Sequence, residues 1–255
     1  MGDAPTFNER ITARFLKGLL ATPRGRAHLL NQVADAEGSD EGAIFDRLLA
    51  HVEDPKLRQM IERHQADELR HAAMFRACLA RTGFEPSPVP AHLRLLDRLD
   101  AHAGNVMKEP VREDRDVMVA YLMLLVIEER ALNQFAQFIP AFDAVDPETA
   151  EVFRQVARDE ERHLRYCYAI SRRYAPGETT WETNLHHFRK LEAIAFGENS
   201  RANMQHVFDN DLHPAGNVER VLWRGVQTVA QHAGWGPRTR FWGTKGVPKL
   251  AEAAA

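Results

Sequence analysis

The feature that most restricts the fold of this chain is a gapless internal repeat of a charged segment. Residues 54–71 read DPKLRQMIERHQADELRH, and residues 146–163 read DPETAEVFRQVARDEERH. Both copies begin with Asp-Pro, which is typical of a helix start because aspartate caps the helix and proline favours its first turn. Both copies end with Asp-Glu-x-Arg-His. We therefore expect two equivalent helices that carry the same charged group at the same distance from their starts.

Apolar residues along most of the chain recur at three- and four-residue steps, which indicates helices rather than strands. We expect four long helices, at about residues 26–51, 55–81, 115–141 and 147–174. The links within each pair are short, which favours antiparallel neighbours, whereas residues 84–115 form a long connection with an amphipathic piece, AHLRLLDRLDAH. The expected fold is an all-α four-helix bundle with a long crossover between the second and third helices.

The remaining segments extend this bundle. We expect one domain, residues 1–255, with an N-terminal helix in residues 1–24, the bundle in residues 25–174 and an extension in residues 175–255. Extra C-terminal helices are expected near residues 181–196, 200–210 and 218–232. The last segment, GWGPRTRFWGTKGVPKL, mixes aromatic and basic residues without an acid. It could bind RNA or a membrane surface, but we prefer packing of its rings on the bundle or on another subunit.

Composition narrows the classes of function. The formal net charge of −3 gives no bulk attraction to nucleic acid or to anionic membranes. Two cysteines do not make a disulfide scaffold, and the N-terminus lacks the uncharged apolar core of a signal peptide. The longest apolar run, residues 117–127, is too short to cross a bilayer as a helix. We therefore expect a cytoplasmic protein without a transmembrane segment, as a monomer or dimer.

The repeated cluster has the spacing of a metal site. Residues three apart lie on one helix face, about 5–6 Å apart at Cβ, so Glu68 and His71 can reach one ion. Glu160 and His163 can do the same from the equivalent helix. Carboxylates can bridge two ions, and a neutral imidazole suits iron, zinc or copper. The alternative is two solvated, ion-paired helix faces. Two copies at matching repeat positions favour the metal site over that alternative, since a single Glu-x-x-His arises readily by chance.

Each of these helices should follow a helix that supplies one more glutamate. Glu37 lies on the apolar face of the first helix. In the third helix the repeat offset favours Glu129, whereas the apolar neighbours at helical spacing favour Glu128. We prefer Glu128, because a one-residue change in a loop shifts an offset at little cost. A glutamate among apolar groups must pair or lose its charge, and two divalent ions would neutralise Glu37, Glu68, Glu128 and Glu160.

Several polar residues near these ligands have other expected roles. His64 lies one turn before Glu68 and is expected to support a ligand or lie at the surface, with direct ligation as the alternative. Glu41, one turn after Glu37, is also interpreted as a supporting residue, with ligation as its alternative. Arg70 and Arg162, inside the two clusters, are expected to point outward and pair with nearby acids.

The order Glu, Glu-x-x-His, Glu, Glu-x-x-His over residues 26–174 resembles the ferritin-like di-iron carboxylate superfamily. The resemblance implies two iron ions, with an iron–manganese pair as the alternative, and Glu68 and Glu160 as bridges. The implied ligands are Glu37, Glu68, His71, Glu128, Glu160 and His163. The stretch IEERALNQFAQFIP, residues 127–140, is similar to the matching helix of tRNA-modifying hydroxylases of this superfamily, which also favours Glu128. His64 resembles the extra histidine of some N-oxygenating members, where that ligand lies in the second half.

Three functions are compatible with these patterns. The first is a di-iron hydroxylase, monooxygenase or oxidase that uses O₂, an organic substrate and an external reductant. The second is iron oxidation or storage of the ferritin or rubrerythrin type, and the third is a metal-free structural bundle. Residues 175–255 exceed what storage needs, and the intact ligand types argue against the third. We therefore expect the enzyme, with Leu124, Leu125, Leu132 and Phe135 as an apolar lining that excludes water.

Overall fold

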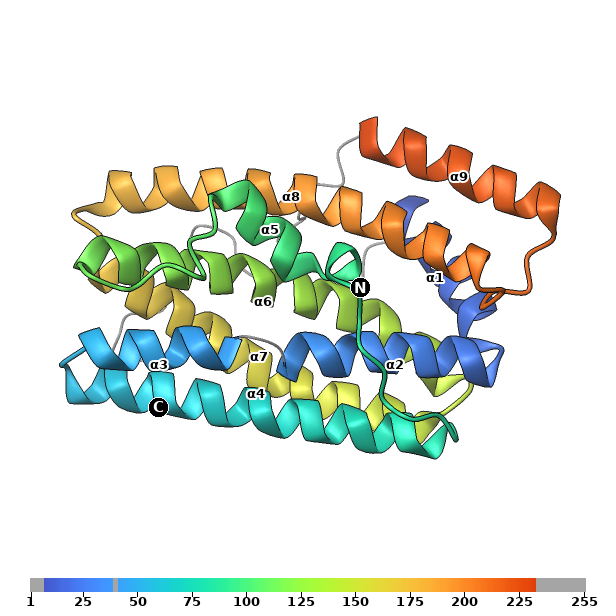
Figure 1. The fold of residues 1–255 in the computed structure, drawn as a ribbon, viewed down its shortest axis with the longest axis horizontal. Coiled ribbons are helices and arrows are strands. Elements are labelled where there is room, and N and C mark those ends of the chain that lie inside the picture. Colours follow the sequence, from blue (N-terminus) through green and yellow to red (C-terminus); the bar gives the residue numbers. More distant parts are fainter. Residues whose placement is uncertain (1–6, 39–40, 233–255) are drawn as a thin grey trace, which may run out of the picture.

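The computed structural model describes residues 7–38 and 41–232, and every regular element within these ranges is a helix. The prediction of an all-helical fold is confirmed. The central helices are α2 (Pro23–Gly38), α3 (Glu41–His51), α4 (Pro55–Arg81), α6 (Asp114–Asp143) and α7 (Pro147–Arg173). Figure 1 shows α2 and α3 one after the other along α4, while α7 packs against α6.

The two repeat copies begin as the sequence predicts. The Asp54 side chain accepts hydrogen bonds from the backbone amides of Lys56 and Leu57, and the Asp146 side chain accepts one from the amide of Thr149. A proline follows each of these caps. Because the first turn of a helix has amides without partners inside the helix, the two carboxylates satisfy donors that would otherwise be lost. The Asp-Glu-x-Arg-His groups therefore stand the same number of turns from each helix start.

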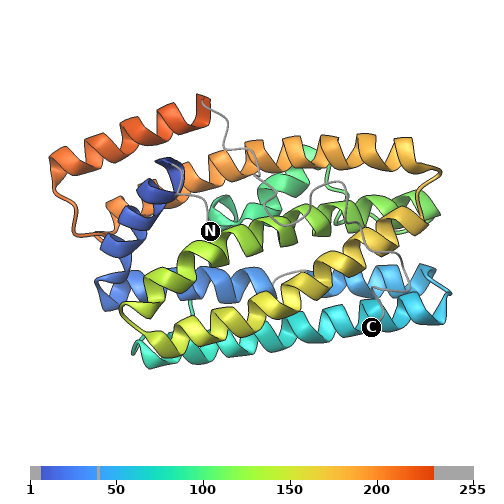
Figure 2. The ribbon, with the colours of Figure 1, turned by 180° about the vertical axis from the view of Figure 1, so that it is seen from behind.

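The crossover between α4 and α6 covers one side of the bundle. It contains the short 3₁₀ helix η1 (Ala91–Leu93) and α5 (Leu95–Ala103), which accounts for the predicted amphipathic piece. A long helix, α8 (Glu178–Asp209), lies along both α5 and α6. Figures 1 and 2 show α1 (Phe7–Leu20) and α9 (Asn217–His232) toward one end of the bundle.

Two helix predictions differ from the structure. The sequence predicts separate helices at residues 181–196 and 200–210, but α8 runs without a break to Asp209, so the predicted break is wrong. The side-chain amides of Asn199 and Asn203 donate to the carbonyl of Leu93 in the crossover, and this contact holds α8 where a break was expected. The predicted first helix appears as α2 and α3, and residues 39–40 between them lie outside the described ranges. The basic, aromatic tail from residue 233 onward also lies outside them.

The apolar core is divided into two clusters along the bundle. In α4, Ile61 belongs to one cluster and Phe75 to the other. In α7, Val156 belongs to the second cluster and Leu164 to the first. The buried histidines and acids of the repeat therefore lie in a layer between two apolar ends, where burial is costly unless each polar group finds a partner. Among the described helices, none combines the length and the apolar content that crossing a membrane requires.

Candidate metal centre

Four helices bring all six predicted ligands together in this polar layer. The side chains form two groups, and the ligand atoms within each group lie within 4.8 Å of one another. One group consists of His64, Glu68, Glu128 and His163, and the other of Glu37, Glu68, His71 and Glu160. Glu68 belongs to both groups, which is the position that a bridging carboxylate would occupy.

The first group is rich in nitrogen. His64 Nε2 lies 3.0 Å from Glu128 Oε1 and 3.3 Å from Glu68 Oε1. His163 Nδ1 lies 3.0 Å from Glu68 Oε1 and 3.8 Å from Glu128 Oε1. His64 is completely buried, so the interpretation of His64 as a surface residue is wrong. Its place beside two carboxylates makes it a potential seventh ligand.

The second group is rich in oxygen. His71 Nδ1 lies 3.2 Å from Glu37 Oε2 and 3.1 Å from Glu160 Oε1. Glu160 Oε2 in turn lies 2.8 Å from Nδ1 of His163, which connects this group to the first. The two groups thus differ in composition, with two imidazoles and two carboxylates in one, and one imidazole and three carboxylates in the other.

The aspartate and arginine of each repeat copy explain why the longer pattern recurs. His71 Nε2 lies 3.3 Å from Oδ2 of Asp159 on the opposite helix, and His163 Nε2 lies 3.3 Å from Oδ2 of Asp67. Arg70 donates to Asp159 at 2.6 Å, and Arg162 donates to Asp67 at 2.5 Å. Each aspartate therefore orients the histidine of the other copy, so that the Nδ1 atoms face the glutamates.

These cross-helix bonds were not predicted from the sequence. The repeat itself was the available signal, since Asp67 and Asp159 occupy matching positions directly before the ligand glutamates. Arg70 and Arg162 do pair with acids, but the prediction that they point outward is wrong for Arg162, whose side chain is only 17% exposed. Its guanidinium is held between the two helices by Asp67 and Asp159.

The structure separates the two candidate glutamates of α6. Glu128 faces His64, whereas Glu129 accepts hydrogen bonds from Arg189 of α8 and from the hydroxyl of Tyr168. Both carboxylates are buried. Only Glu128 belongs to a group that could hold a metal ion. The side chain of the other alternative, Glu41, lies outside the described side chains.

Burial and mutual repulsion raise the pKa values of two of the carboxyl groups. Burial raises the pKa of Glu37 well above its ordinary value, and the charges of Glu68 and Glu160 add to this. Burial likewise raises the pKa of Glu128, and the same two neighbours raise it further. Burial would also raise the pKa of Glu160, but the charge of His163 outweighs this effect and holds it well below the ordinary value.

The histidines complete this pattern. Burial alone would lower the pKa of His71, but the carboxylates of Glu160 and Glu37, 3.1 and 3.2 Å from its Nδ1, outweigh this effect and raise the pKa to about 10. Burial would lower the pKa of His163 too, but the charge of Glu160 and bonds to its other acids raise it. Burial and the positive charge of His163 lower the pKa of His64 to about 4. The pKa values of two glutamates and two histidines are therefore raised together, which favours protonation in this acidic layer.

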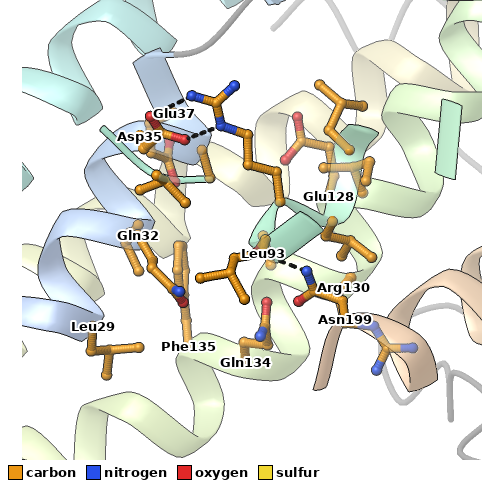
Figure 3. A pocket seen from close by; sticks show the side chains of 18 of the residues that line it. Leu29, Gln32, Asp35, Glu37, Leu93, Glu128, Arg130, Gln134, Phe135 and Asn199 are labelled. Atoms are coloured by element: carbon orange, nitrogen blue, oxygen red, sulfur yellow. Dashed lines mark hydrogen bonds and ion pairs between the residues drawn. The ribbon is translucent and has the colours of Figure 1, made fainter. Parts of the chain in front are cut away.

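A cavity of about 180 Å³ borders this site. Its walls come from α2, α6, α8 and the crossover, and Glu37, Glu68, Glu128 and Glu160 all line it. Figure 3 shows Glu37 and Glu128 toward one end of the view, and Gln134 and Phe135 toward the other. Of the four residues predicted as an apolar lining, Phe135 lines this cavity, while Leu124, Leu125 and Leu132 pack in the first apolar cluster.

The fold and the site together define a helical protein whose buried histidines and glutamates could hold a metal ion. Comparisons with known protein families, with curated proteins and with solved structures found no match for the chain.

Proposed function

We propose that this chain is an oxygen-activating di-iron oxidoreductase, a hydroxylase, monooxygenase or oxidase built on a ferritin-like bundle. The observation that carries the proposal is the convergence of seven buried or nearly buried ligand side chains beside a cavity that can admit an organic molecule. The order of the helices and the long crossover between α4 and α6 support the ferritin-like arrangement. External electrons, O₂ and an organic substrate would be its partners.

The donor set fits two transition-metal ions. Oε1 of Glu68 and Oε1 of Glu160 are buried and make no hydrogen bond, although imidazole nitrogens lie 3.0 and 3.1 Å from them. Such atoms are rare in proteins and call for a partner. Imidazoles suit iron, copper and zinc, while carboxylates suit harder ions, so a mixed set favours iron, with an iron–manganese pair as the variant.

The surroundings of the site favour an enzyme over iron storage. The cavity beside the four carboxylates is bordered by the crossover and by α8, and α8 is an element that a storage bundle does not require. Arg130 of α6 binds Glu192 of α8 through two hydrogen bonds of 2.6 and 2.8 Å, which fixes α8 over the cavity. This arrangement provides a lined chamber for a substrate.

The protein side chains would position the metals and shield them. Two ferrous ions bound here would supply the two electrons that, with two protons, convert O₂ and a substrate C–H group into an alcohol and water. Asp67 and Asp159 hold the imidazoles in place, and the two apolar clusters exclude water from both ends of the layer. An external reductant would restore the ferrous state after each turnover.

A single-turnover experiment tests this function. The protein is loaded with ferrous iron without oxygen and then mixed with O₂, while the absorption spectrum and the dissolved O₂ are recorded. We expect rapid O₂ consumption with about one O₂ per pair of irons. An unchanged spectrum over hours would rule out oxygen activation. Continued O₂ uptake with a mineral in a large assembly would replace the enzyme with iron storage.

A further inference from the structure

The size of the cavity limits what can reach the four carboxylates. An engineered apolar cavity of about 150 Å³ binds benzene, so a slightly larger cavity accommodates one ring with a short chain. The cavity here measures about 180 Å³. A monocyclic aromatic or a short aliphatic molecule therefore fits inside it.

The charges around the cavity are already paired within the protein. Among the described residues that line it, two arginines are the only Lys, Arg or His residues. Arg94 donates to both carboxylate oxygens of Asp35, at 2.8 and 3.2 Å. Arg130 is engaged with Glu192 and also stacks over Phe196, with 3.8 Å between the guanidinium carbon and the ring centroid. The described lining therefore offers no free cation to a carboxylate or a phosphate, and an anionic ligand would lose its hydration without compensation.

Away from the four glutamates, the side chain of Gln134 is available to a ligand. The Gln134 side chain lines the cavity, points into it in Figure 3, and makes no hydrogen bond with any described residue. The other amides of the wall are engaged, since Asn199 donates to the carbonyl of Leu93 at 2.8 Å and Gln32 donates to Asn203. A glutamine amide offers both a donor and an acceptor, so it suits a carbonyl, amide or hydroxyl group.

The position of Gln134 sets the orientation of the ligand. Gln134 follows Glu128 by six residues on α6, and six residues of α-helix span about 9 Å. Both side chains line the same cavity. An elongated molecule of the size above can therefore bind its polar group at Gln134 and place its other end beside Glu128. Between these ends the wall is apolar, with Ile127, Ala131 and Phe135.

We infer that the cavity binds a mainly apolar molecule without an anionic group, of the size of one ring with a short chain, with one carbonyl, amide or hydroxyl group at the end away from the carboxylates. That molecule is the substrate class of the proposed oxidoreductase. The inference rests on the proposed function only for the fate of this molecule, because its binding depends on size, charge and Gln134. Oxidation would then fall on the apolar end that lies next to Glu128.

Binding is tested with the full chain, as isolated and after metal removal, by calorimetry and ligand-observed NMR. The probes are 3-phenylpropanamide, its anionic analogue 3-phenylpropanoate, and the hydrocarbon propylbenzene. We expect the amide to bind at least about tenfold more tightly than the carboxylate. Gln134→Leu should weaken binding of the amide about tenfold and leave the affinity for propylbenzene unchanged or higher. Gln137→Leu, on the same helix but outside the cavity wall, is the matched control.

Filling the cavity gives a second test. Ala131→Phe places a ring in the cavity and should abolish binding of all three probes, whereas Ala136→Phe, at an exposed position of the same helix, should not. Tighter binding of the carboxylate, or an amide affinity indifferent to Gln134→Leu and Ala131→Phe, would overturn the inference. If the three probes bind as expected but the iron-loaded protein does not react with O₂, the proposed function is contradicted and the binding inference stands. If the protein reacts with O₂ but the probes do not bind as expected, the binding inference is contradicted and the proposed function stands.

Discussion

The neighbouring glutamates of α6 allow a matched comparison in which one substitution should remove metal and the other should remove stability. Glu128 and Glu129 are consecutive and both buried. Glu128 lies 3.0 Å from His64 Nε2 and belongs to the nitrogen-rich group, while Glu129 is paired with Arg189. Each is replaced by alanine in turn. Because their partners differ, we expect Glu128→Ala to lose metal and Glu129→Ala to lose stability.

The expected magnitudes follow from these partners. Changes to groups that merely orient a ligand cost about 10–100-fold in metal affinity, so Glu128→Ala should cost more than about 100-fold and leave at most one metal per chain. Because the Glu128 carboxyl lies beside an existing cavity, its loss should change the unfolding free energy of the metal-free protein by less than about 1 kcal/mol. Glu129→Ala leaves Arg189 without its carboxylate. Since the Arg189 side chain is 26% exposed, we expect a cost of about 1–3 kcal/mol rather than the full cost of a deeply buried pair.

Two measurements resolve this comparison. The metal content after iron loading and dialysis reports the ligand role, and urea denaturation of the metal-free proteins reports stability. The expected result is a metal-poor, stable Glu128→Ala protein and a metal-replete, destabilised Glu129→Ala protein. If Glu129→Ala lost its metal while Glu128→Ala kept two ions, the assignment of the α6 ligand would be wrong.

Three further predictions follow from the same contacts. Asp67→Asn should weaken metal binding about 10–100-fold in a metal titration, because His163 loses the carboxylate that orients it. The control Glu161→Gln, at an exposed position of α7, should bind metal as tightly as the native chain. His64→Ala should weaken one of two metal-binding steps and spare the other, because His64 belongs to the nitrogen-rich group alone; equal weakening of both steps in calorimetry would contradict this. Metal affinity should rise with pH, because the pKa values of His71, His163 and two glutamates are raised and metal binding must displace their protons. A pH-stat should record the release of up to about four protons per pair of ions. Metal binding without proton release would refute this prediction.

The helices and much of the candidate site could be predicted from the sequence, because the signals for them lie within single helices. The repeat aligns Glu68 with Glu160 and His71 with His163, and the caps before them locate the helix starts. The apolar neighbours of Glu128 indicate the buried face, and the structure places that side chain beside His64. These inferences need only the period of a helix.

The features that were missed depend on how helices rotate and pack against each other. The bond between Asp67 and His163 joins α4 to α7, and no pattern within either helix specifies that pairing. The continuity of α8 depends on its contact with Leu93, far away in the sequence. The walls of the cavity depend on the rotation of α6, which turns Phe135 toward the cavity and Leu132 toward the apolar cluster.

The most direct test of the whole account is the iron content of protein produced with iron, measured together with its absorption spectrum after reduction and exposure to air. We predict two iron ions per chain, one for each of the two groups that share Glu68, and a spectrum that changes on contact with O₂. Protein that retains no iron under these conditions, or that holds two irons with a spectrum indifferent to O₂, would contradict it.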